Sequence, residues 1–150
     1  MTDSELHFRK LERMYMDAGR TNINTAVYQG IHLKVDDERA EISLMTEPKF
    51  FHAANSLHGS VYFKMLDDAA FFAVNSVVHD VFVYTVSFNI QILRPVTGGV
   101  IKSFGALKFK SKNLFVADAN LFDERNILVG RGSGNFMKSK LGLTPEIGYR

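Results

Sequence analysis

The chain has 150 residues, a length that suits one domain with its own core, and its 46% apolar and 23% charged residues are ordinary for a folded protein. A net charge of +2 is too small to indicate a nucleic-acid-binding protein by itself. The absence of cysteine excludes disulfides, thiolate nucleophiles and cysteine-based metal sites.

The first residues, MTDSELHFRKLERM, carry acidic side chains early and lack the apolar run of a signal peptide. No stretch reaches 18 uninterrupted apolar residues, so we expect no membrane span and, by default, a cytoplasmic protein. Residues 101–150 are basic, whereas residues 1–100 are slightly acidic. The basic part is either a solvated surface or a site for an anionic ligand such as a phosphate.

Two predicted elements open the chain. Residues 4–17 have the apolar spacing of an amphipathic helix. Thr2 and Glu5 have capping-box spacing at its start, and Gly19 suits its end. Residues 31–46 are predicted to form a β-hairpin, because apolar and polar side chains alternate on both sides of a charged turn.

A mostly apolar stretch without proline, residues 58–78, predicts a buried helix. Four strand-like runs separated by turn sequences follow it, at 81–94, 100–110, 114–122 and 127–137. The simplest architecture is α+β, a long central helix cradled by a curved antiparallel sheet of about six strands. We expect one domain over residues 1–150, with an extra N-terminal helix in residues 1–20 and a tail at 139–150.

Two adjacent aspartates lie in the predicted buried helix, Asp67 and Asp68. Successive helical residues point about 100° apart, so at most one of them is expected to face a given site. Asp68 has Lys64 four residues before it, the spacing of an ordinary ion pair on a helix surface. Asp67 has Phe63 and Phe71 at helical spacing. It is either a catalytic carboxylate or a buried acid paired with a neighbouring strand or a second subunit.

The start of the same helix reads His58-Gly59-Ser60. Free N–H groups and the positive end of the dipole make a helix N-terminus a natural site for an anion or an oxyanion. A plain junction between a loop and a helix explains the same residues. The preceding loop adds hydrogen-bonding side chains, which loop chemistry also explains: His52, Asn55 and Ser56. The five histidines have no spacing typical of a metal site, so no metal is expected.

The segments HGSVYFKMLDDAAFFAVNS at 58–76 and VSFNIQILRP at 86–95 resemble hotdog-fold thioesterases of the phenylacetyl-CoA (PaaI-like) type. That family carries His-Gly-Gly at the start of its central helix and an Asp nine residues after the His, which falls on Asp67. Its small hydroxyl residue in the next strand falls on Thr85. The Asn-Ile-…-Arg-Pro-like end of that strand falls on residues 89–95. The element order agrees over nearly the whole chain.

The chain departs from the family pattern at two positions. Ser60 stands where the family has its second glycine, and His52 stands where the family often has Asn. The residue that polarises the thioester carbonyl or orients water is therefore open between His52 and Asn55.

The resemblance implies a hotdog fold and hydrolysis of aryl- or fatty-acyl-CoA. The N–H of Gly59 would polarise the thioester carbonyl, aided by His58, and Asp67 would act as general base or nucleophile. Thr85 would position water or Asp67. It also implies a site formed between two subunits of a homodimer or a dimer of dimers.

No cofactor is implied, since CoA is part of the substrate. Candidate residues for binding CoA are Ser60, Lys112, Asn113, Arg131 and Lys138. Four phenylalanines are expected to line an acyl pocket or to lie in a dimer interface: Phe50, Phe51, Phe71 and Phe72.

Two other functions remain open. A hotdog hydratase or dehydratase would act on the same thioesters, but the acid here has the spacing of the thioesterases. A non-catalytic acyl-CoA-binding module is the second alternative, because the family Asn is replaced by His52.

Overall fold

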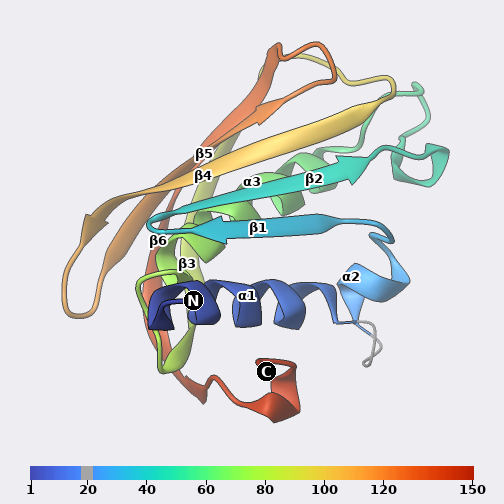
Figure 1. The fold of residues 1–150 in the computed structure, drawn as a ribbon. Coiled ribbons are helices and arrows are strands. Elements are labelled where there is room, and N and C mark those ends of the chain that lie inside the picture. Colours follow the sequence, from blue (N-terminus) through green and yellow to red (C-terminus); the bar gives the residue numbers. More distant parts are fainter. Residues whose placement is uncertain (18–21) are drawn as a thin grey trace.

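The structure, a computed structural model, describes residues 1–17 and 22–150. A long helix, α3, packs inside a curved sheet, with α1 and α2 beside it (Figure 1). The helices are α1 (Asp3–Met16), α2 (Ile23–Ala26) and α3 (Gly59–Asn75), and the strands are β1 (His32–Asp36), β2 (Arg39–Met45), β3 (Val81–Ile92), β4 (Val100–Lys110), β5 (Phe115–Phe122) and β6 (Leu128–Gly142). Short 3-10 helices lie at Pro48–Phe50 and Pro145–Ile147.

The six strands form one antiparallel sheet in the order β1-β2-β4-β5-β6-β3. The central helix, the wrapping sheet and the extra N-terminal helix confirm the predicted architecture (Figure 1). β1 and β3 are the two edge strands. α1 covers part of the β1 edge, because Arg9 donates to the Val35 carbonyl and the Val35 N–H donates to Glu12, each at 2.8 Å.

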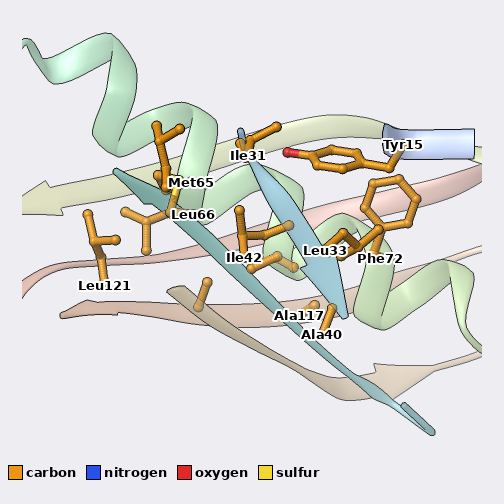
Figure 2. Packing of buried hydrophobic residues seen from close by; sticks show 14 of the residues in the cluster. Tyr15, Ile31, Leu33, Ala40, Ile42, Met65, Leu66, Phe72, Ala117 and Leu121 are labelled. Carbon is orange, nitrogen blue, oxygen red and sulfur yellow. The ribbon is translucent and has the colours of Figure 1, made fainter. Parts of the chain in front are cut away.

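Small residues let α3 lie close to the sheet. A Cβ on Gly105 of β4 would lie 2.1 Å from the carbonyl oxygen of Ala69, so only glycine fits there. Ser103, also on β4 and fully buried, donates to the Met65 carbonyl at 2.6 Å. Figure 2 shows Met65 and Leu66 of α3 among the apolar side chains of the strands. This packing fixes the rotation of α3, and with it the direction of each polar side chain on the helix.

Two boundaries differ from the predicted ones. α3 ends at Asn75, not near residue 78, because the Asn75 side chain accepts from the Val83 N–H and donates to the carbonyls of Val78 and Val81. β6 continues to Gly142, where it pairs with Val81, so the first part of the predicted tail belongs to the sheet.

The short helix α2 was not predicted. Asn22 caps it by accepting from the N–H groups of Asn24 and Thr25, a capping box that the sequence pattern Asn22-x-x-Thr25 could have indicated. The predicted helix stop at Gly19 lies outside the described residues. Among the described residues, no helix is long and apolar enough to cross a membrane.

Candidate active site

Asp67 lies on the side of α3 that faces β3. Thr85, on β3, donates from Oγ1 to Oδ1 of Asp67 at 2.8 Å. The helix and the strand thus bring together the two residues that the sequence analysis had matched separately to the family pattern. A hydroxyl that donates to a carboxylate favours its charged form and fixes its orientation.

Burial raises the pKa of Asp67 to about 6, against the smaller lowering effect of the Thr85 hydrogen bond. The neighbouring Asp68 carboxylate also raises this pKa, and Lys64 lowers it. A carboxylate whose pKa is close to neutrality accepts a proton more readily than an ordinary one and is still ionised at pH 7. The environment of Asp67 therefore suits a general base.

Asp68 also faces this region, which corrects the expectation that only one of the two aspartates would do so. Both line a cavity of about 210 Å³ under α1 and α2. Asp68 Oδ2 lies 2.7 Å from Lys64 Nζ and accepts from the Tyr15 hydroxyl at 2.6 Å. The expected pair of Lys64 with Asp68 exists, but it is enclosed by α1, not placed on a helix surface. Tyr15 was missed as a site residue, because it is distant in sequence.

The rest of that cavity is largely aromatic. Phe71 and Phe72 of α3 and Phe82 of β3 line it, together with Asn24 of α2. Tyr15 packs edge-on against Phe72, with ring centroids 5.1 Å apart (Figure 2). Phe71 is half-buried and lines the same cavity as Asp67.

The two remaining phenylalanines named from the sequence lie away from this cavity. Phe50 is buried and stacks on Tyr28, with ring centroids 5.3 Å apart. Phe51 is half-buried next to it, and its backbone bridges to Leu57.

The N-terminus of α3 forms a second cavity, of about 450 Å³. His58 caps the helix, because its Nδ1 accepts from the Ser60 N–H at 3.0 Å, and the Val61 N–H donates to the His58 carbonyl. Among the hydrogen bonds of the described residues, none uses the N–H of Gly59. Gly59 lines the cavity, so its N–H is available to a ligand oxygen there.

The structure separates the two candidates for the missing family Asn. His52 and Ser56 line the cavity beside Gly59. Asn55 is exposed, and its backbone has φ +62°, a left-handed conformation that Asn tolerates in a tight turn. Asn55 thus shapes the loop. Arg94, whose carbonyl accepts from Tyr62 at 2.8 Å, also lines the cavity and was not predicted as a binding residue.

The candidate residues for CoA lie apart within one chain. Ser60 is exposed beside Gly59, and Arg131 on β6 donates to Gln91 of β3 at 2.7 Å. Lys138 is also exposed on β6, seven residues after Arg131. At ~3.3 Å per residue, the two side chains are about 23 Å apart along the strand. Lys112 and Asn113 are exposed between β4 and β5. One chain does not gather these residues into a single patch.

Comparison with known proteins decides the family. The sequence model of the thioesterase superfamily matches residues 54–129. This range includes α3, which contributes residues to both cavities, and β3, which carries Thr85. The chain belongs to the thioesterase superfamily. No curated protein matches it by sequence.

Solved structures of thioesterase-superfamily and related proteins share its hotdog fold. The PaaI protein of E. coli, from the phenylacetic acid degradation operon, superposes with a TM-score of 0.82 at 19% identity, covering 95% of this chain and 100% of that chain. A putative thioesterase of Ralstonia eutropha, related to phenylacetic acid degradation, gives 0.73 at 19% identity, covering 87% and 98%. A thioesterase of Haemophilus influenzae gives 0.75 at 16% identity, covering 89% and 91%. The sequence match confirms the thioesterase superfamily, and the solved structures confirm the hotdog fold.

Proposed function

We propose that the protein hydrolyses acyl-CoA thioesters to a free acid and CoA. The observation that carries this proposal is Asp67, a carboxylate with a raised pKa that the Thr85 hydroxyl orients at the edge of an aromatic cavity. Membership of the thioesterase superfamily supports the reaction class. An aryl or fatty acyl group matches the phenylalanines that line the cavity.

In the proposed reaction Asp67 removes a proton from water, and the water oxygen attacks the thioester carbonyl carbon. The carbonyl oxygen gains negative charge, which the free N–H of Gly59 and the positive end of the α3 dipole stabilise. Collapse of the tetrahedral intermediate breaks the C–S bond, and the CoA thiolate takes up a proton. In the alternative route Asp67 attacks the carbonyl carbon itself, the C–S bond breaks and the CoA thiolate leaves and takes up a proton. Water then hydrolyses the resulting anhydride, which releases the acid and restores Asp67.

We propose that one site uses two chains. Gly59 and Asp67 lie on the same helix, separated by about 12 Å at ~1.5 Å rise per residue. One carbonyl group cannot contact both, because the N–H must reach its oxygen while the base reaches water at its carbon. A second copy that places its Gly59 next to the first chain's Asp67 removes this difficulty. The edge strand β3, which carries Thr85, suits an interface of this kind in a homodimer or a dimer of dimers.

In this arrangement the CoA moiety of the substrate extends outward from the Gly59 cavity. Its phosphates need cations, and Arg94 and Arg131 are the basic side chains nearest that end of the sheet in the register of β3 with β6. Lys112, Asn113 and Lys138 lie toward the other end, and they can contribute only to the site that a second copy completes.

The deciding experiment is thioester hydrolysis, followed by thiol release, across a panel of aryl- and fatty-acyl-CoAs. Asp67→Asn is the test variant and Asp118→Asn, a half-buried aspartate on β5, the matched control. We expect turnover that Asp67→Asn lowers by about 10²–10⁴-fold, whereas Asp118→Asn leaves it close to the original value.

The same panel tests the alternative of a non-catalytic binding module, which the replacement of the family Asn by His52 favours. CoA esters that bind without turnover on any member would support that alternative and contradict hydrolysis. Water addition to an enoyl-CoA without thiol release would instead indicate a hydratase.

A further inference from the structure

Lys64 is enclosed by side chains from separate parts of the chain. Its ammonium lies 2.7 Å from Asp68 Oδ2 and 2.6 Å from Asn24 Oδ1. The ring centroids of Tyr15 and Tyr28 both lie 5.2 Å from the same nitrogen. The side chains of Lys64 and Asp68 are only 13% and 16% exposed. Burying two charges costs desolvation energy, so an enclosed pair is weak support for stability and invites a functional explanation.

The enclosed pair adjoins Asp67. Lys64, Asp67 and Asp68 line the same cavity. Two adjacent carboxylates in such a place repel one another, and ionisation of one opposes ionisation of the other. Lys64 offsets this repulsion, because its contact with Asp68 makes the pair neutral overall.

We infer that Lys64 and Asp68 are positioning residues for Asp67: held together by Tyr15 and Asn24, they form a neutral pair that lets Asp67 ionise beside a second carboxylate. This inference rests on the proposed function for its catalytic meaning. It gives the N-terminal segment a role, because the Tyr15 hydroxyl of α1 and the Asn24 amide oxygen of α2 hold the two members of the pair.

The other described groups around Asp67 are neutral. Thr85 faces it from β3, Tyr15 from α1, and Tyr28 lies beyond Lys64, between α2 and β1. Burial raises the pKa of Tyr15 well above its ordinary value and also raises that of Tyr28, so both phenols stay protonated near neutral pH. The charges that act on Asp67 in this region are therefore those of Lys64 and Asp68, in agreement with their opposite effects on its pKa.

The test measures ionisation of Asp67 directly, by NMR titration of its carboxyl carbon in the full-length protein. Lys64→Met leaves Asp68 unpaired and should move the Asp67 midpoint to higher pH by about one unit. Asp68→Asn leaves the Lys64 charge without its carboxylate partner and should move the Asp67 midpoint to lower pH. The double variant Lys64→Met/Asp68→Asn removes both charges and should return the midpoint close to the original value.

Lys110→Met is the matched control, because Lys110 forms an exposed pair with Glu38 at 3.7 Å and should not change the Asp67 midpoint. Methionine keeps most of the aliphatic length of the Lys64 side chain. If Lys64→Met does not fold, the Asp68→Asn variant decides alone. An Asp67 midpoint that does not move to lower pH in Asp68→Asn overturns the inference. Two single variants that shift the midpoint in the same direction, or not at all, overturn it as well.

The titration does not depend on turnover, so the two proposals fail separately. A protein without thioesterase activity but with opposite midpoint shifts supports the role of the pair and contradicts only the proposed function. Turnover with an unshifted midpoint in both single variants leaves the proposed function standing and overturns this inference. In an active enzyme, the acid limb of kcat/KM should follow the NMR midpoint in each variant.

Discussion

The Thr85 hydroxyl on β3 donates to Oδ1 of Asp67 on α3 at 2.8 Å, and this bond joins the edge strand to the central helix. It opposes the effect of burial, which raises the pKa of Asp67 to about 6. The bond therefore increases the fraction of Asp67 that is ionised at neutral pH.

Thr85→Val removes this hydrogen bond with little change of shape. We expect the acid limb of kcat/KM, near pH 6 in the unaltered protein, to move to higher pH by about one unit or more, because a hydrogen bond to a charged group contributes about 1.5–3 kcal/mol. The measurement is the pH-rate profile of thiol release. Thr85→Ser keeps the hydroxyl, so the acid limb of its kcat/KM should stay at the original pH. An unchanged limb in Thr85→Val would show that the bond does not act on the catalytic group.

Gly59→Pro removes the free N–H at the start of α3. Proline suits the first position of a helix, and His58 before it already has the extended backbone (φ −66°, ψ +143°) that precedes proline. We expect kcat to fall about 10²–10³-fold, the loss typical of one oxyanion donor. Gly59→Ala keeps the N–H, and its added Cβ would meet only the end of the flexible Ile92 side chain at 3.2 Å. A similar loss of kcat in Gly59→Pro and Gly59→Ala would show that added bulk at this position, and not the missing N–H donor, causes the effect.

Mixing Asp67→Asn with Gly59→Pro tests whether one site uses two chains. Each variant alone should be nearly inactive. A mixed dimer has one site with both residues intact, so unfolding and refolding the two together should restore about a quarter of the original activity. The measurement is activity against the mixing ratio. Inactivity at every ratio, with mixed dimers demonstrated by mass, would place the whole site within one chain.

Asp67→Asn should also stabilise the protein above pH 6. The folded-state pKa of about 6 exceeds the ordinary value of 3.8, so the folded protein binds this proton more tightly than the unfolded chain does. The contribution of Asp67 to stability is then greatest below pH 3.8 and is lost as the pH rises through 6. We expect Asn, which cannot ionise, to raise the free energy of unfolding at pH 8 by about 1–3 kcal/mol.

Chemical denaturation at pH 8 and at pH 4.5 measures this effect. The increase in the free energy of unfolding caused by Asp67→Asn should be smaller at pH 4.5, where Asp67 is mostly protonated in the folded protein. Asp118→Asn serves again as the control. A gain for Asp67→Asn that is equal at both pH values would contradict the linkage to ionisation.

Local patterns were enough to predict most of the elements. The apolar stretch that became α3, the alternation in the strands and the turn residues between them depend on near neighbours in the chain, and so does the capping of α3 by His58. The spacing of His58 and Asp67 together with Thr85 also indicated the family, which the match over residues 54–129 confirmed.

The short helix α2 was missed although the local pattern Asn22-x-x-Thr25 indicates its cap. Two other errors have contacts between distant residues as their reason. Asp68 and Lys64 have the spacing of a surface pair, and nothing near them in sequence shows that Tyr15 and Asn24 enclose them. The end of β6 at Gly142 likewise follows from its pairing with Val81.

By itself the sequence determined the fold class, the order of most elements and the candidate residues Gly59, Asp67 and Thr85. The elements depend on short-range periodicity, and the candidates on residue type and spacing. Only the tertiary structure decided that Thr85 bonds Asp67, that the N–H of Gly59 stays free beside a cavity, and that α1 covers the charges next to Asp67. The physical reason is that the pKa and orientation of a side chain depend on the groups packed around it. Here those groups come from a helix, a strand and an N-terminal segment that only packing brings together.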